Sequence, residues 1–144
     1  MILTIEGVDK TGKNTLHKYI EQLANHKYVI TDRGILTQLV YAQKFNRKHT
    51  YNLDWYINNV IIYLTAENED LKVRCSITDE KPFDMKGDKS LFELWKLHLQ
   101  LRGFIVYEYN TSKMTPYEIA IDVIEKVSSL EQSKEWKQMM GEYK

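Results

Sequence analysis

The segment GVDKTGK, residues 7–13, sets tight limits on the architecture because it joins an apolar run to a helical pattern. Residues 2–5 (ILTI) predict a short strand, and residues 13–24 carry apolar side chains at helical spacing. Gly7 and Gly12 allow backbone angles that turn amide N–H groups inward, and the helix start points its positive dipole end at the same place. The spacing therefore predicts a phosphate-binding loop in which the Lys13 ammonium reaches the β- and γ-phosphates of a nucleotide. The alternative is an ordinary glycine turn.

The residue after Lys13 departs from the usual pattern of such loops. That position normally supplies a hydroxyl group to Mg²⁺, whereas Asn14 offers an amide oxygen. An amide oxygen ligates a hard cation directly or through water, but it suits an octahedral site less well. Thr15 lies one residue further round the helix and points in a different direction. Asn14 is therefore a candidate magnesium ligand, and weaker metal binding is the alternative.

Strand and helix patterns alternate along most of the chain. Strand-like runs at residues 28–31, 60–64 (VIIYL) and 104–109 are separated by helical patterns at residues 35–45, 67–77 and 90–103. Ser90 and Glu93 read as a capping box for the third of these helices, and Thr115, Pro116 and Glu118 open a last one. This order predicts an α/β, three-layer P-loop NTPase fold with a parallel sheet of four strands, or five, flanked by helices. Ligands of such sheets bind at the carboxyl ends of the strands, where residues 7–13 lie.

Length and composition fit one domain in a reducing compartment. The 144 residues are 43% hydrophobic and carry 20 basic and 20 acidic side chains, which argues against broad nucleic-acid binding but leaves a local basic patch open. Cys75 is the only cysteine, so an internal disulfide is precluded and a cytoplasmic protein is favoured. We expect no signal peptide and no membrane span. The expected organisation is a domain over residues 1–130, with a polar lid at about residues 78–89, and a helical tail over residues 131–144.

Four segments, in order along the chain, resemble the thymidylate kinase-like group of P-loop nucleoside monophosphate kinases. They are IEGVDKTGKNTL (residues 5–16), DRGILTQLVYAQKF (32–45), VIIYLTAENEDLKVRC (60–75) and FIVYEYNTSKMTPYEIAIDVI (104–124). The similarity covers most of residues 1–130. The loop motif is specific to P-loop proteins, and the Asp32-Arg33 pair is moderately specific in this order. A P-loop kinase fold is what the resemblance implies.

The resemblance assigns roles to four charged residues near the loop. Asp32 would serve the metal, and Arg33 would grip the phosphate of the acceptor nucleotide through paired hydrogen bonds. Asp9 would contact a sugar hydroxyl, and Lys10 would stabilise charge on the transferred group. The structural alternatives are a helix cap for Asp32, a surface ion pair for Arg33, a turn acid for Asp9 and a solvated side chain for Lys10. With Lys13, these give the expected catalytic set of Lys13, Asp32, Arg33 and Lys10, and the metal ligands would be Asn14 and Asp32.

The donor nucleotide is expected on the same edge of the sheet. Arg74 precedes the lid and could face the phosphates, with a solvated helix arginine as the alternative. Asn110 and Lys113 follow the last strand, where the family holds the donor base, although a polar turn explains them as well. The expected nucleotide-binding set is Gly7, Asp9, Thr11, Gly12, Lys13, Asn14, Thr15, Arg74, Asn110 and Lys113.

The chain also departs from the family pattern. The family has another strand, with an acceptor-binding segment, before the Asp-Arg motif, and here only a helix and a short turn separate the loop from Asp32. The lid has three lysines, Lys81, Lys86 and Lys89, and no arginine. The favoured function is transfer of the γ-phosphoryl group of ATP, with Mg²⁺, to a (deoxy)nucleoside monophosphate. The alternatives are a catalytically weak nucleotide-binding or regulatory protein, or a kinase of a nucleic-acid end or modified base. A homodimer is an assembly that the resemblance allows.

Overall fold

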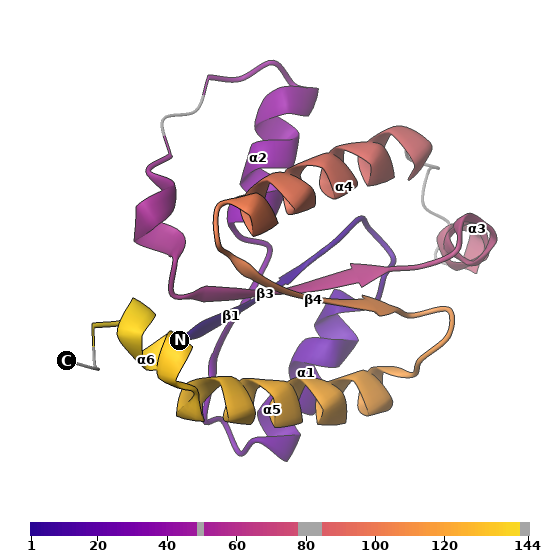
Figure 1. The fold of residues 1–144 in the computed structure, drawn as a ribbon. Coiled ribbons are helices and arrows are strands. Elements are labelled where there is room, and N and C mark those ends of the chain that lie inside the picture. The colour runs from indigo at the N-terminus through magenta and orange to yellow at the C-terminus, as the bar shows by residue number, and fades with distance from the viewer. Residues whose placement is uncertain (49–50, 78–84, 142–144) are drawn as a thin grey trace.

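A parallel four-stranded sheet forms the centre of the protein (Figure 1). The computed structural model describes residues 1–48, 51–77 and 85–141. The strands are β1 (Ile2–Glu6), β2 (Val29–Asp32), β3 (Asn59–Thr65) and β4 (Ile105–Asn110), in the order β2-β1-β3-β4. Ile5 pairs with Asp32 on one side and with Ile62 on the other. The predicted four-stranded parallel sheet is confirmed, and no fifth strand is present among the described residues.

Helices cover both faces of this sheet (Figure 1). The helical elements are α1 (Lys13–Leu23), α2 (Ile35–Lys44), a 3₁₀ turn η1 (Leu53–Tyr56), α3 (Asn68–Ile77), α4 (Met85–Leu101), α5 (Pro116–Gln132) and α6 (Lys134–Met139). α1 packs with α5 on one face, and α2 packs with α4 on the other. Ile62 of β3 lies in the core below α1 and α5, whereas its neighbours Ile61 and Tyr63 lie in the core below α2 and α4. Burial on both faces explains the continuous apolar run of β3.

The sheet ends at β2, on the side that carries Asp32. Residues 24–28 form only a turn between α1 and β2, so β2 is an edge strand. Its side chains are mostly exposed, with Val29 61% accessible to solvent. No strand of the described residues pairs with the free side of β2, so the sheet is open beside Asp32.

The prediction that this helix begins at Ser90 is wrong: it begins at Met85, so residues 85–89 of the expected polar lid are helical, and a lid role stays a prediction. Ser90 is inside α4 and donates a hydrogen bond to the Lys86 carbonyl at 2.9 Å, so it does not cap the helix. Tertiary contacts hold this first turn, because Asp88 accepts from Lys44 Nζ of α2 at 2.7 Å. Lys89 Nζ donates to the Ala66 carbonyl at 2.6 Å and to Asn68 Oδ1 at 2.9 Å. Residues 78–84, with Lys81, lie outside the described residues.

The predicted cap of the last long helix is confirmed. Thr115 Oγ1 accepts from the Glu118 backbone N–H, and the Glu118 carboxylate accepts from the Thr115 N–H, each at 3.2 Å, with Pro116 as the first helical residue. Beyond α5, the short helix α6 buries Trp136 in the core below α1 and α5. The C-terminal segment is thus part of the folded body as far as Met139.

We expect Thr115→Ala to lower the free energy of unfolding by about 1 kcal/mol, because the first turn of α5 loses the side-chain acceptor of its orphan N–H group. Urea denaturation followed by circular dichroism measures this change. Ser129→Ala, an exposed position in the same helix, is the control and should shift the midpoint little. Equal midpoints for the two variants would contradict a stabilising cap.

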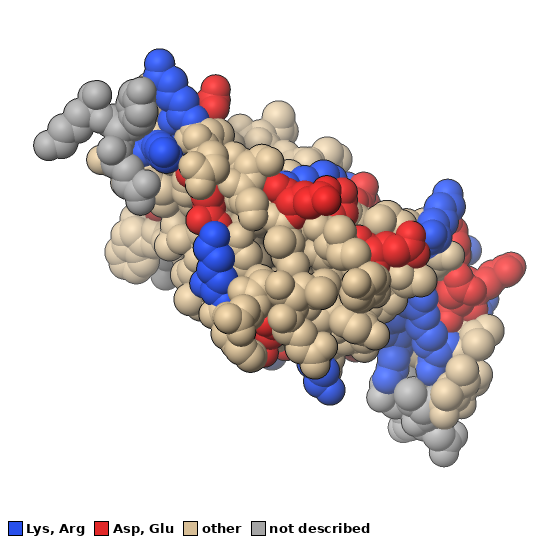
Figure 2. Space-filling view, turned by 90° about the horizontal axis from the view of Figure 1, so that it is seen from below, with Lys and Arg blue, Asp and Glu red and all other residues tan. Residues whose placement is uncertain are grey.

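Charges of both signs are mixed over the face that carries α5. Figure 2 shows lysines and arginines next to aspartates and glutamates on this face, with no continuous patch of one sign. Within the described residues, no helix is long and apolar enough to cross a membrane.

Candidate functional site

The glycine loop, residues 7–12, leaves the carboxyl end of β1 and turns sharply into α1. Gly7 has φ +143°, and a Cβ atom there would collide with the Leu64 carbonyl of β3. Gly12 has φ +92° and lies immediately before the first residue of α1. Both positions require glycine, the first for the close approach and both for the backbone angle. Lys10 also has positive φ (+68°) although it carries a side chain.

Lys13 is held inside this loop. Its Nζ donates to the carbonyl oxygens of Gly7 at 3.0 Å and Val8 at 2.7 Å, and the residue is only 9% exposed. Burial lowers the pKa of Lys13 from 10.5 to about 8, while the nearby Asp9 carboxylate acts in the opposite direction. The buried Thr11 hydroxyl donates to the Val8 carbonyl at 2.8 Å, so it braces the loop. An ammonium group with two carbonyl partners can exchange them for an anion that enters beside it.

One pocket of about 380 Å³ lies at the carboxyl end of β1, between the glycine loop, the first turn of α1 and the end of β2. Its lining is Asp9, Lys10, Gly12, Lys13, Asn14, Thr15, Asp32 and Arg33. Each of these residues was a predicted site residue. They come together because the carboxyl ends of adjacent parallel strands share one edge. The start of α1 adds a partial positive charge to this edge, which suits an anion.

Arg33 and Asp9, which both line the pocket, form an ion pair. Arg33 Nη2 lies 3.0 Å from Asp9 Oδ1, and both side chains are about half exposed. The Arg33 backbone is itself constrained, because its φ is +67° and its N–H donates to the Ile5 carbonyl at 2.9 Å. An exposed ion pair of this kind contributes little to stability. Arg33 is therefore available to an anionic ligand that competes with Asp9.

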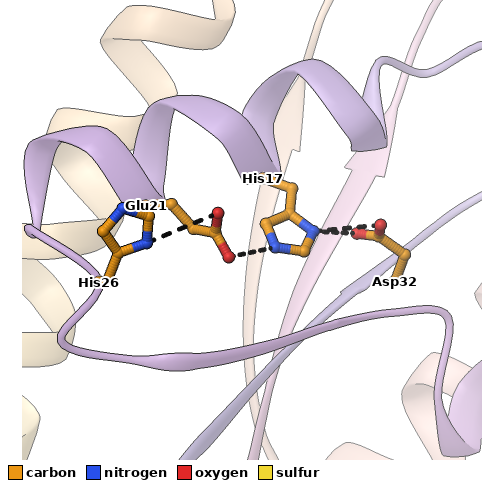
Figure 3. A network of polar contacts seen from close by, with 4 residues as sticks. All are labelled: His17, Glu21, His26 and Asp32. Atoms are coloured by element: carbon orange, nitrogen blue, oxygen red, sulfur yellow. Dashed lines mark hydrogen bonds and ion pairs between the residues drawn. The ribbon is translucent and has the colours of Figure 1, made fainter.

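Asp32 is held by a histidine that the sequence did not single out (Figure 3). His17 Nδ1 lies 3.0 and 3.1 Å from the two Asp32 oxygens, and its Nε2 lies 2.9 Å from Glu21 Oε1. Burial opposes a charge on His17, but the hydrogen bonds to Asp32 and Glu21 outweigh it and raise the pKa of His17. The spacing offered a signal, since His17 lies one helical turn after Lys13 and one before Glu21.

Glu6 is a second residue that sequence reasoning missed. It is fully buried at the end of β1, and its carboxylate accepts from the N–H groups of Gly34 (2.7 Å), Leu36 (2.6 Å) and Thr37 (3.2 Å) and from the Thr37 hydroxyl (2.6 Å). Burial raises the pKa of Glu6, and these donors act in the opposite direction. Glu6 thus caps α2 and fixes the chain directly after Arg33. An acid at the end of an apolar strand was the available signal.

Five residues of the expected nucleotide-binding set lie outside the lining of this pocket: Gly7 and Thr11 in the glycine loop, and Arg74, Asn110 and Lys113 on the expected donor side. Arg74 donates to the Lys10 carbonyl and to Thr111, and is half-buried. Asn110 Nδ2 donates to Glu67 Oε1 at 3.1 Å, and its Oδ1 accepts from the Ser112 N–H at 2.9 Å. Lys113 is exposed in the same turn. Their roles toward a nucleotide stay predictions.

Comparison with known proteins finds a relative from Bacillus subtilis. No family model matches the chain. The SPbeta prophage-derived uncharacterized protein YorR of Bacillus subtilis (strain 168) is 26% identical over 124 residues, which cover 80% of this chain and 74% of that protein. The crystal structure of YorR in complex with phosphorylated GDP superposes with a TM-score of 0.72 and 21% identity, over 92% of this chain and 99% of that one. The protein therefore shares its α/β fold with YorR, and membership of the thymidylate kinase-like group stays a prediction.

Proposed function

We propose that this protein is a small P-loop kinase that moves the γ-phosphoryl group of ATP to a nucleotide, most simply a (deoxy)nucleoside monophosphate. The observation that carries the proposal is that Lys13, the start of α1, Asp32 and Arg33 meet in one pocket. Phosphoryl transfer is catalysed by positioning and charge neutralisation, and these groups supply both. The crystal structure of a relative with the same fold, in complex with phosphorylated GDP, supports a nucleotide as the ligand.

The residues have distinct tasks in this proposal. The loop amides and Lys13 hold the donor phosphates, with Lys13 exchanging its carbonyl partners for phosphate oxygens. Arg33 leaves Asp9 to bind the acceptor phosphate, for which its planar guanidinium is better suited than an ammonium group. Lys10, at the pocket wall, adds positive charge near the transferred group.

Mg²⁺ fits the donor set at this pocket. Asn14 and Asp32 both line it, and they offer an amide oxygen and a carboxylate. The described residues contain no group of three or more His, Cys, Asp or Glu side chains that could hold a metal ion by themselves. Mg²⁺ in kinases needs fewer protein ligands, because the substrate phosphates and water complete its shell. The bound ion would neutralise charge on the phosphate oxygens.

We expect Asn14→Ser to tighten Mg²⁺-dependent nucleotide binding about three- to tenfold, because a hydroxyl suits the octahedral shell better than an amide. Isothermal titration with ATP, with and without Mg²⁺, measures the change. Binding in the presence of EDTA is the matched condition and should be unaltered. If the Mg²⁺-dependent affinity does not rise, another residue holds the metal.

A catalytically weak nucleotide-binding protein is the second candidate. Two observations favour it: β2 is an exposed edge strand where longer kinases are expected to have an acceptor segment, and Arg33 is already engaged by Asp9. In this case the donor side would bind a nucleotide while no acceptor is oriented for attack.

One transfer assay separates the two functions. The protein is incubated with γ-labelled ATP, Mg²⁺ and a panel of nucleoside monophosphates, deoxynucleoside monophosphates, guanine nucleotides and short oligonucleotides, with Lys13→Ala as the inactive control. We expect label transfer to at least one mononucleotide, lost in Lys13→Ala. ATP binding without transfer to any acceptor would leave the second candidate, and the absence of ATP binding would contradict both.

A further inference from the structure

Arg74 ties three segments together at the carboxyl edge of the sheet. Its Nη1 donates to the Lys10 carbonyl at 2.7 Å and to Thr111 Oγ1 at 3.1 Å, and its Nη2 lies 3.3 Å from the Thr111 carbonyl. The guanidinium thus joins α3, the glycine loop after β1 and the turn after β4. This arrangement differs from the role expected for Arg74 at the nucleotide, because these three contacts are made to two backbone carbonyl groups and a threonine hydroxyl.

The Lys10 end of this contact is the part of the loop that most needs support. Lys10 lies in the left-handed region, with φ +68°, which is unfavourable for a residue with a Cβ atom and persists only where its surroundings impose it. The flanking positive φ values are at Gly7 and Gly12, where they are freely adopted. Arg74 thus donates its hydrogen bond to the carbonyl of Lys10, the non-glycine residue of the loop with a positive φ.

The contact also fixes the direction of an amide donor. The carbonyl of Lys10 and the N–H of Thr11 belong to one planar trans peptide unit, so they point in opposite directions. Holding the Lys10 oxygen with Arg74 therefore holds the Thr11 N–H as well. A hydrogen bond to the oxygen of a peptide also polarises its N–H and makes it a stronger donor to an anion.

The other end of the contact is firmly anchored. The Thr111 N–H donates to the Thr65 carbonyl at the end of β3 at 2.8 Å, and the Thr111 hydroxyl donates to the same oxygen at 3.1 Å. Thr65 pairs with Asn110 of β4, so Thr111 follows directly from the sheet. Arg74 therefore connects the loop to the carboxyl end of the β3–β4 strand pair.

We propose that Arg74 is a positioning residue that holds the Lys10–Thr11 peptide unit in its anion-binding orientation, and so increases polyphosphate affinity without contacting the base of the nucleotide. This inference rests on the proposed function, because it assigns Arg74 a task in the same phosphate site. It predicts that the residue matters for any ligand with a polyphosphate group, whatever that ligand carries beyond it.

Two ligands separate this role from a direct contact with the base of the nucleotide. Affinities for inorganic tripolyphosphate and for ATP are measured by isothermal titration for the wild type, Arg74→Met, Arg74→Lys and Thr111→Val. Lys72→Met, exposed on the same helix, is the control. We expect Arg74→Met to weaken the binding of both ligands by the same factor, about tenfold. Arg74→Lys and Thr111→Val should weaken the binding of both ligands by a smaller factor. A loss for ATP alone indicates a base contact and would overturn the proposal, as would unchanged affinities for both ligands.

Amide hydrogen exchange of the ligand-free protein gives an independent readout. We expect faster exchange at Thr11 and Gly12 in Arg74→Met, with exchange along β3 unchanged. Should that variant fail to fold, Arg74→Lys and Thr111→Val carry the same comparison. If the wild type binds neither ligand, the proposed function fails. Faster exchange at Thr11 and Gly12 would then still support the positioning of the Lys10–Thr11 peptide unit by Arg74. Unchanged exchange would overturn it.

Discussion

Substitution of Lys13 by methionine is expected to weaken nucleotide binding strongly while it stabilises the folded protein. The loss of binding follows from removal of the buried ammonium group, whose truncation costs about 2–5 kcal/mol when its partner is a charged ligand group. This corresponds to a Kd for ATP that rises at least about thirtyfold. Equilibrium titration with ATP measures the loss.

The gain in stability follows from the environment of the same side chain. Burial lowers the pKa of Lys13 from 10.5 to about 8, which corresponds to about 3 kcal/mol against the charged form in the folded state. Methionine fills a similar volume without a charge. Loss of the hydrogen bonds to Gly7 and Val8 offsets part of this gain. We therefore expect a net increase of about 1–2 kcal/mol in the free energy of unfolding, measured by urea denaturation.

Opposite signs of the two effects identify a residue retained for binding. Lys18→Met is the matched control, because Lys18 is an exposed lysine on the same helix outside the phosphate pocket. It should change neither ATP affinity nor stability by more than about 0.5 kcal/mol. A Lys13→Met variant that binds ATP normally would contradict the phosphate site. A variant that loses stability would mean that the two carbonyl contacts outweigh the burial of charge.

The proximity of Lys13, Asp32 and Arg33 could be predicted because it depends only on local sequence patterns and on parallel strand pairing. A strand, a glycine loop and a helix place Lys13, and parallel pairing places the end of β2 next to the end of β1. The double-sided burial of β3 follows in the same way from its apolar run. These features depend on the local pattern and on the general geometry of parallel sheets.

The missed features depend on partners that are distant in the chain. The first turn of α4 is polar and therefore resembled a loop in the sequence. In the structure it is held by hydrogen bonds from Lys44 to Asp88 and from Lys89 to the Ala66 carbonyl, which the local sequence does not reveal. The hydrogen-bond partners of Glu6 are 28 to 31 positions away in the sequence. The partner of His17, Asp32, is 15 positions away. Which side chains meet across such separations depends on rotamers and on tertiary packing, which the local sequence pattern does not reveal.

The second large effect is expected at Glu6. Glu6→Ala removes the acceptor of three backbone N–H groups and one hydroxyl at the start of α2; three of these four contacts are buried and the one from Gly34 is partly buried. Buried donors without partners are costly, and water that enters the cavity replaces only some of the bonds. We expect the free energy of unfolding to fall by about 3 kcal/mol, measured by urea denaturation.

Two further variants show whether the carboxylate itself is needed. Thr37→Val removes one of the four donors and should cost about 1 kcal/mol. Glu6→Gln keeps the shape but turns an NH₂ group toward N–H donors, so its cost should fall between those of Thr37→Val and Glu6→Ala. Glu125→Ala, exposed on α5, is the control. If Glu6→Gln is as stable as the wild type, the carboxyl group is protonated in the folded state.

The effect of Glu6 should also extend to the candidate site. The Gly34 N–H donates a hydrogen bond to Glu6, and Gly34 directly follows Arg33. Loss of this bond would loosen the first turn of α2 and the backbone that holds Arg33 at positive φ. We expect Glu6→Gln to accelerate amide exchange at Gly34, Leu36 and Thr37 and to weaken acceptor binding more than ATP binding, because Lys13 and the glycine loop keep their own contacts. Equal losses for donor and acceptor would mean instead that Glu6 supports the whole carboxyl edge of the sheet.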